Sequence, residues 1–145
     1  MIKLFLIINK HGEMKFNSFY DDEIKMNKTH LINQLYHLII QQNEQNSFFM
    51  IERMKIIFRK YSNIYVIIGC TIEENENEII ELIHFIMKIF SKIIGNLTET
   101  LFLSRIDDFH FILDCIIFNG LIINTDEQSI INECLFINKD SLYSI

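Results

Sequence analysis

The chain has 145 residues, with 13 lysines and arginines against 19 aspartates and glutamates, so its net charge is −6. This acidic balance argues against a dedicated nucleic-acid-binding protein, because such proteins neutralise phosphates with clustered cations. Half of the residues are hydrophobic and only 22% are charged, which excludes a disordered chain and leaves an apolar excess that must fill a large core or meet a partner.

No segment of the sequence indicates export, membrane insertion or a second domain. The apolar run Leu4–Ile8 lies between Lys3 and Lys10 and is too short for a signal-peptide core, and no stretch approaches the roughly 20 apolar residues of a membrane span. The three cysteines are widely spaced, as is typical of reduced, buried thiols. We therefore expect a single domain over residues 1–145 in a cytoplasmic protein.

Turn residues between two apolar segments predict a β-hairpin at the amino terminus. Residues 2–8 and 14–20 form the expected strands, and Asn9–Glu13 forms the turn, in which Gly12 can adopt a positive φ. An amphipathic helix is expected from about Asn27 to Gln42, where apolar residues recur at helical spacing.

Three further strands are expected next, at Phe48–Glu52, Lys55–Arg59 and Ile64–Thr71. Short turns separate them, with the first at Arg53-Met54, so we expect an antiparallel meander. The third strand is apolar on both faces and therefore belongs in the centre of the sheet.

A long helix is expected from about Asn77 to Ile94. The acidic run Glu73–Glu78 lies at its start, where the helix macrodipole favours negative charge. Its polar residues, among them Glu81, His84 and Lys88, form only a narrow stripe. A helix that is apolar over most of its circumference must be buried on more than one side. The sequence therefore predicts that an external partner or a second covering helix contacts it.

The carboxyl-terminal third is expected to be helical in short pieces. Residues 106–118 place apolar side chains at helical spacing, and we interpret Asn119-Gly120 as the left-handed cap that ends this helix. Residues 125–128 resemble the capped start of a last helix over residues 129–136. The order of the elements predicts an α+β fold with a five-stranded antiparallel sheet.

The sequence contains no phosphate-binding loop, dinucleotide fingerprint or metalloprotease motif. His110 and Asp114 lie four residues apart beside Cys115 and suggest a Cys-His nucleophile, but we favour the alternative of a surface or interface histidine with a local hydrogen bond. His30 and His37 lie seven residues apart, too far to chelate a metal without outside ligands. We expect no enzymatic activity, no cofactor and no metal site.

A short basic stretch lies beside two of the expected turns and consists of Arg53, Lys55, Arg59 and Lys60. We interpret it as a solvated edge of the sheet. The alternative is a contact with acidic lipid or acidic peptide.

Four groups of residues together carry a family resemblance: Met1–Gly12, Lys55–Tyr61, Glu76–Glu78 with Ile83–Phe85, and Ile112–Asp114 with Asn119-Gly120. In order and spacing they resemble the small (sigma) subunits of the heterotetrameric adaptor-protein complexes of vesicle transport. The resemblance covers nearly the whole chain. It implies a longin-like fold, in which helices flank a five-stranded antiparallel sheet.

Other segments look most like the fourth, clathrin-independent type of complex, which works at the trans-Golgi network: Asn43–Phe48, Val66–Gly69, Glu76–Glu78 and Asp108–Asp114. The chain departs from the family at Leu101–Arg105, where an acidic residue between leucines and then Phe-Asn are usual. It departs again at Cys115, where an acid is usual.

The resemblance implies a non-catalytic subunit that stabilises the core of an adaptor complex and contributes to the recognition of cargo sorting signals. Its implied partners are a large adaptin-type solenoid subunit, the medium and second large subunits, and cargo-tail peptides. Its implied location is cytoplasmic and peripheral, on Golgi, trans-Golgi network or endosomal vesicle membranes. The alternative is a free-standing longin-domain regulator, such as a tethering-complex subunit or a SNARE amino-terminal domain.

Some members of the family bind a dileucine signal, in which an acid and three further residues precede Leu followed by Leu or Ile. Matching by position implies that the two apolar pockets are lined here by Tyr61, Ser62, Ile64, Met87, Leu97 and Phe102. Lys15 stands where the family has a base and would attract the acid of the signal. The alternative is that Ile64, Met87 and Leu97 are simply core residues.

Overall fold

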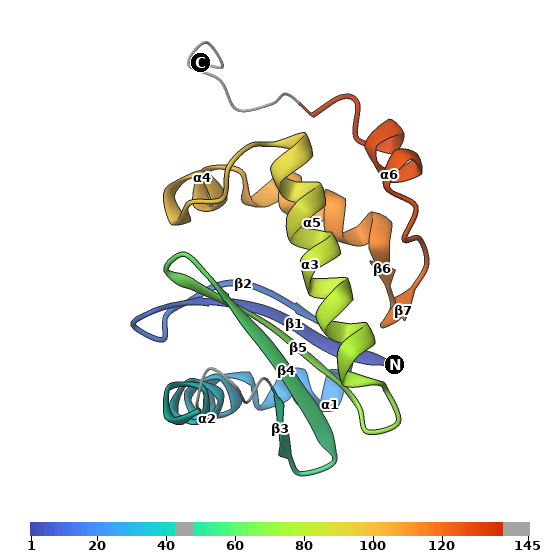
Figure 1. The fold of residues 1–145 in the computed structure, drawn as a ribbon. Helices are drawn as coiled ribbons and strands as arrows, with labels where there is room; N and C mark the ends of the chain where they lie inside the picture. The colour runs from blue at the N-terminus through green and yellow to red at the C-terminus, as the bar shows by residue number, and fades with distance from the viewer. Residues whose placement is uncertain (43–47, 138–145) are drawn as a thin grey trace.

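The computed structural model describes residues 1–42 and 48–137. A five-stranded antiparallel sheet lies at its centre (Figure 1). The strands are β1 (Ile2–Asn9), β2 (Met14–Phe19), β3 (Phe48–Ile51), β4 (Met54–Tyr61) and β5 (Ile64–Thr71), in the order β2-β1-β5-β4-β3. The prediction of an α+β fold with five antiparallel strands is confirmed, and so is the central place of β5, which pairs with both β1 and β4.

Two helices cover one face of the sheet. They are α1 (Asp22–Met26) and α2 (Lys28–Gln41). The buried face of α2, with Leu31 and Leu35, packs against side chains of β1 such as Leu4 and Leu6. Helix α1 was not predicted from the sequence. Asp21 caps it by accepting hydrogen bonds from the backbone N–H groups of its first turn.

The other face of the sheet carries α3 (Glu76–Ile93), α4 (Glu99–Ser104), α5 (Ile106–Ile116) and α6 (Glu127–Glu133) (Figure 1). Asn75 caps α3, since its side-chain oxygen accepts from the N–H groups of Asn77 and Glu78. Aromatic rings fill the space between this helical layer and the sheet. The ring centroid of Phe109 lies 4.9 Å from that of Phe16 and 5.0 Å from that of Phe102.

The apolar circumference of α3 is covered within the chain itself. Strands β4 and β5 of the sheet contact the helix, and so do α5 and α6. Ile83, Ile86 and Ile89 are therefore fully buried. Of the two interpretations offered above, a second covering helix is confirmed, and an external partner is not needed to bury α3. No helix within the described ranges is long and apolar enough to cross a membrane.

The segment after α5 differs from its prediction. The helix ends at Ile116, and β6 (Ile117–Phe118) then pairs with β7 (Leu121–Ile122) as a short hairpin. Asn119 and Gly120 form its two-residue turn with φ values of 51° and 81°, the geometry of a type I′ turn. The interpretation of Asn119-Gly120 as a helix cap was therefore wrong, although the left-handed backbone was correct.

The turn between β3 and β4 also shifts by one residue. Glu52-Arg53 forms it, because Ile51 already pairs with Met54, and Glu52 has a φ of 53°. The strand β4 is longer than expected and reaches Tyr61, where the next turn begins.

We expect Phe109→Ala to destabilise the chain by about 3–5 kcal/mol, because the fully buried ring lies between four other aromatic rings and its removal leaves a cavity. Phe118→Ala is the matched control, since that ring is 57% exposed, and a change within about 0.5 kcal/mol is expected. Urea denaturation monitored by circular dichroism measures both. Equal decreases in the free energy of unfolding for the two variants would contradict the assignment of Phe109 to the core.

Candidate functional site

The residues that the family resemblance implies are gathered at one corner of the molecule. Tyr61 ends β4, Ser62 and Asn63 form the turn, and Ile64 begins β5. Ile64 pairs with Tyr61 on one side and with Asn9 on the other, so the β4–β5 turn lies beside the β1–β2 turn (Figure 1). We call this region, with α4 and the facing part of α3, the turn corner.

Tyr61 joins the turn corner to α3. Its hydroxyl lies 2.5 Å from Nδ1 of His84, and the two rings meet edge to face with centroids 5.9 Å apart. Burial raises the pKa of the Tyr61 hydroxyl, so it stays protonated near neutral pH and can donate to His84. Met87 lies three residues after His84 on the same helix and is 4% exposed. The hydrogen bond therefore holds the end of β4 beside the helical turn that carries Met87.

Asn9 connects the β1–β2 turn to α4. It is a buried polar residue, and its Nδ2 donates to Oε1 of Glu13 at 3.0 Å and to Oε1 of Glu99 at 3.3 Å. Its Oδ1 accepts from the backbone N–H groups of His11 and Glu13, both at 2.9 Å. The side chain of Asn9 thus forms hydrogen bonds with both the β1–β2 turn and α4. Nothing in the sequence beyond a turn-forming residue type indicated this role.

Lys15 lies in the same region and already has an acidic partner. Its Nζ is 3.9 Å from Oε2 of Glu13. The hydrogen bond from Asn9 and the charge of Lys15 hold the pKa of the Glu13 carboxyl below its usual range, so this partner is ionised at neutral pH. A peptide carboxylate that reached Lys15 would compete with Glu13.

The six residues implied for the apolar pockets differ in exposure. Tyr61, Ser62 and Leu97 reach the surface. Ile64, Met87 and Phe102 are 1%, 4% and 0% exposed, and belong to the core between the sheet and the helices. The structure therefore brings together a surface of three residues above a layer of buried apolar side chains.

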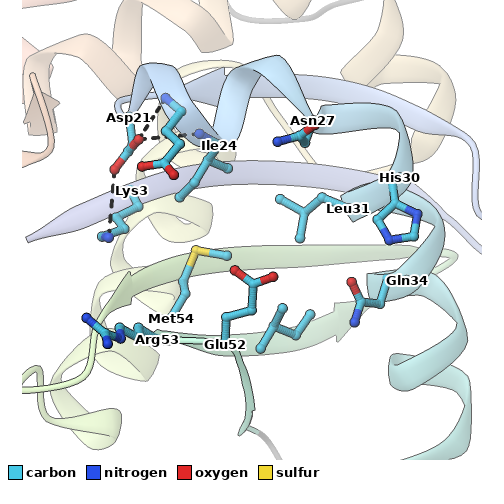
Figure 2. Close-up of a pocket in the computed structure, with 12 residues that line it drawn as sticks. Lys3, Asp21, Ile24, Asn27, His30, Leu31, Gln34, Glu52, Arg53 and Met54 are labelled. Atoms are coloured by element: carbon cyan, nitrogen blue, oxygen red, sulfur yellow. Dashed lines mark hydrogen bonds and ion pairs between the residues drawn. The ribbon is translucent and has the colours of Figure 1, made fainter.

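A cavity of about 450 Å³ lies on the opposite face of the sheet, between α1, α2 and the β3–β4 turn (Figure 2). Leu31, Ile51 and Met54 are its buried apolar residues. The polar residues around them include both acids and bases: Lys3, Asp21, Glu23, Asn27, His30, Gln34, Glu52 and Arg53. The sequence analysis missed this cavity because it did not predict α1. A rim that carries both signs of charge does not select one class of ligand.

The candidate Cys-His nucleophile is not supported by the geometry. Burial, followed by a hydrogen bond with Glu133, raises the pKa of the Cys115 thiol to about 12, whereas a nucleophilic cysteine needs a lowered pKa. The His110 ring packs against Phe16, with centroids 4.8 Å apart. Among residues 1–42 and 48–137 no three His, Cys, Asp or Glu side chains are grouped so that they could hold a metal ion.

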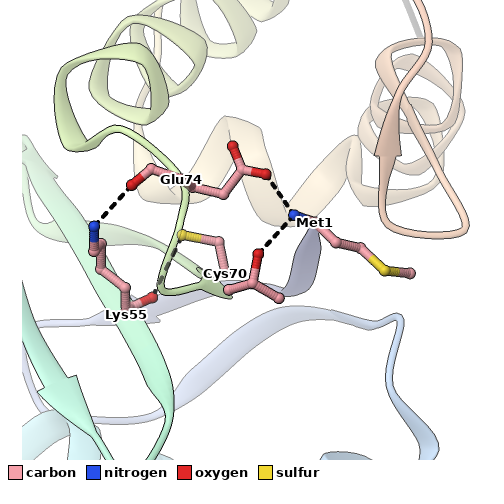
Figure 3. A network of polar contacts seen from close by, with 5 residues as sticks. Met1, Lys55, Cys70 and Glu74 are labelled. Carbon is pink, nitrogen blue, oxygen red and sulfur yellow. Dashed lines mark hydrogen bonds and ion pairs between the residues drawn. The ribbon is translucent and has the colours of Figure 1, made fainter.

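The basic stretch does not form a solvated sheet edge, because β4 lies between β5 and β3. Lys55 is 8% exposed, and its Nζ donates to the carbonyl oxygen of Glu74 at 2.7 Å (Figure 3). The same Nζ lies 3.0 Å from Oε1 of Glu76. The amino group of Met1 contacts Oε1 of the same Glu74 and Oγ1 of Thr71. Lys55 therefore fastens the start of α3 to the sheet, and the interpretation of this stretch as a solvated sheet edge was wrong.

The sequence of the chain is similar to those of known adaptor complex subunits. Residues 1–141 match the family described as clathrin adaptor complex small chain. The chain is 30% identical over 143 residues to the AP-4 complex subunit sigma-1 of Homo sapiens, covering 97% of this chain and 99% of that protein. It is 26% identical to the AP-4 complex subunit sigma of Arabidopsis thaliana, covering 95% and 97%.

The fold is similar to that of a chain in a homology model of the full-length AP-3 complex in a stretched open conformation. The TM-score is 0.72 at 22% sequence identity, and the match covers 94% of this chain and 92% of the other. The likeness extends over nearly the whole of both chains, so it concerns the complete arrangement of sheet and helices.

We expect Cys115 to react with iodoacetamide at pH 8 at least about a hundredfold more slowly in the native chain than in urea. A thiol with a pKa raised to about 12 holds far less thiolate at pH 8 than a free cysteine does. Mass spectrometry of the alkylated peptides over time measures the rate at each cysteine. A native rate similar to the unfolded rate would contradict the raised pKa, and a native rate above the unfolded rate would show that Cys115 is activated and return the nucleophile to consideration.

Proposed function

Because the chain belongs to the clathrin adaptor complex small chain family, it is a small subunit of an adaptor complex of vesicle transport, and we propose that it also contributes to the recognition of cargo sorting signals. The observation that carries the assignment is the family match over residues 1–141. The alternative of a free-standing longin-domain regulator does not fit, because the relatives are complex subunits matched over nearly their full length.

The proposed partners are a large adaptin-type solenoid subunit, together with the medium and second large subunits of a heterotetramer. The likeness to AP-4 sigma subunits supports a complex of the fourth type, and hence a peripheral location on Golgi, trans-Golgi network or endosomal vesicle membranes. The proposed role is structural and recognitional, without catalysis, as in the relatives.

The turn corner is the proposed binding site for a dileucine signal. Tyr61, Ser62 and Leu97 form its surface, and Ile64, Met87 and Phe102 form the apolar layer beneath. Each leucine side chain that entered this layer would gain roughly 1.5–3 kcal/mol from burial. Binding requires an opening, since the lower residues are already packed. The side chains that must move are those at the surface.

The bond between Tyr61 and His84 would be broken by such an opening. A hydrogen bond of this kind contributes about 0.5–1.5 kcal/mol net to stability. This is less than the free energy gained by burying two leucine side chains. Lys15 is the proposed contact for the acid of the signal. Because Glu13 already neutralises Lys15, the acid adds orientation and a modest increase in affinity.

Affinity purification of the tagged chain from its own cells, followed by mass spectrometry, tests membership of the complex. We expect a large adaptin-type, a medium and a second large subunit to be recovered in similar amounts with it. The same tag on an unrelated small protein is the control. A chain that is recovered as a soluble monomer without these subunits would contradict the proposal.

Titration of the assembled complex with a fluorescent peptide that contains Glu, three further residues and Leu-Leu tests the site. We expect Leu97→Asp to weaken binding at least about tenfold, because a charge would be placed where a leucine must be buried. Ile40→Asp is the matched control, since Ile40 is 51% exposed on α2, outside the turn corner, and it should leave the affinity within about twofold.

Lys15→Ala completes this test. It should lower the affinity for the peptide that contains Glu by a few-fold and leave the affinity for a peptide with Gln in place of Glu unchanged, because only the carboxylate interacts with the ammonium group of Lys15. A wild-type complex that binds neither peptide, or a Leu97→Asp complex with unchanged affinity, would exclude the turn corner as a dileucine site.

A further inference from the structure

The place beside Lys15 where the acid of a signal would bind, which we call the acid subsite, already contains a carboxylate of the chain itself. The Nζ of Lys15 lies 3.9 Å from Oε2 of Glu13, two residues earlier in the chain. The Lys15 side chain is 23% exposed, whereas that of Glu13 is 63% exposed. Lys15 therefore offers little free surface, and a carboxylate that arrives from a peptide must approach it beside Glu13.

Three hydrogen bonds to Asn9 hold Glu13 in this position. The backbone N–H of Glu13 donates to Oδ1 of Asn9 at 2.9 Å, and its carbonyl oxygen accepts from the backbone N–H of Asn9 at 3.0 Å. Its Oε1 accepts from Nδ2 of Asn9, also at 3.0 Å. One carboxylate oxygen thus binds Asn9 while the other faces Lys15. Because its backbone and side chain are both fixed, Glu13 meets Lys15 at a smaller loss of conformational entropy than a flexible peptide does.

A second carboxylate lies next to that of Glu13. The Nδ2 of Asn9 also donates to Oε1 of Glu99, at the start of α4, over 3.3 Å. Glu13 and Glu99 therefore share one neutral amide group. In the part of the chain that the structure describes, Lys15 is the only cation that forms an ion pair with either acid. The carboxylate of a signal would be the third acid in this region, and like charges placed together lower affinity.

The benefit that a signal gains from its acid is therefore a difference between two ion pairs. A signal with an acid gives Lys15 one carboxylate in exchange for another, because Glu13 is ionised at neutral pH. A signal with an uncharged residue at the same position leaves Lys15 paired with Glu13. Selectivity is the difference between the two binding free energies, and here Lys15 has an anionic partner in both complexes.

We propose that Glu13 occupies the acid subsite and thereby widens the class of signals that this subunit accepts. Dileucine signals with an uncharged residue in place of the acid bind nearly as well as acidic ones, because Lys15 keeps an internal partner when the signal supplies none. Glu13 is then a specificity-determining residue that the signal does not need to contact. The inference rests on the proposed function, since it concerns the peptide site at the turn corner, and it adds the class of signal.

Titration of the assembled complex with two fluorescent dileucine peptides, which differ only in Glu or Gln at the acid position, measures this selectivity. We expect the wild type to prefer Glu by at most about threefold, and Glu13→Gln to raise the preference to about tenfold at low salt and less at high salt. Gln keeps an oxygen that accepts from Asn9, and circular dichroism checks that the fold is retained. Glu78→Gln is the matched control. It removes the same charge at the exposed start of α3, outside the turn corner, and should keep the wild-type preference.

The double variant Glu13→Gln/Lys15→Ala identifies the cation through which Glu13 acts. It should lose the preference for Glu, because the selectivity that Glu13→Gln adds depends on Lys15. If the wild-type complex binds the peptides, an unchanged preference in Glu13→Gln, or an equal change in affinity for both peptides, would overturn this inference alone. A wild-type complex that binds neither peptide would instead exclude the turn corner as the signal site, and the inference with it.

Discussion

A helix that is apolar over most of its circumference is stable in water only if the rest of the protein covers it on more than one side, and α3 imposes this requirement on the fold. The sheet covers part of its apolar surface, and α5 with α6 covers another part. The interdigitated rings of Phe16, Phe102 and Phe109 fill the space that remains near α4. The carboxyl-terminal third therefore contributes to the main hydrophobic core of the domain. Its own outward side carries the apolar residues that the core does not use.

The same packing explains why residues of the turn corner belong both to the core and to the proposed binding site. Ile64 and Met87 contribute to the burial of α3, and they also lie directly beneath the residues that would meet a peptide. A pocket made of core residues must be closed when empty, because an open apolar cavity forfeits packing energy. Tyr61 and Leu97 stand at its boundary with water. The proposed recognition of a signal is thus coupled to a local rearrangement of the core.

Most of the fold follows from patterns that are local in sequence. The strands were predictable because short apolar runs alternate with turn residues, and α3 because its polar stripe recurs at helical spacing. The five residues of α1 are too few to show a periodicity. Asn119-Gly120 was ambiguous, since positive φ suits both a helix cap and a type I′ turn. The deciding contact, the hydrogen bond from the N–H of Ile2 to the carbonyl oxygen of Gly120, joins distant parts of the chain.

The candidate site was only partly predictable for a related reason. The family resemblance implied its residues, of which Ile64, Met87 and Phe102 are buried while Tyr61, Ser62 and Leu97 reach the surface. The sequence could not indicate that Lys15 is already paired with Glu13, or that Lys55 is buried against Glu74 and Glu76. Charged residues are interpreted as solvated by default, and only the tertiary contacts reveal which of them are neutralised.

The place of β1 has a consequence for how the chain is made. This strand is synthesised first, yet its neighbour β5 comes about sixty residues later, and the bond from Ile2 to Gly120 closes later still. During translation the apolar residues Leu4–Ile8 have only β2 as a pairing partner until β5 leaves the ribosome. The strand β1 is therefore synthesised well before the partners with which it pairs. Its apolar residues remain exposed, and so prone to aggregation, for much of the elongation of the chain. The five-stranded sheet can therefore close only after β5 has been synthesised, and until then one side of β1 has no pairing partner.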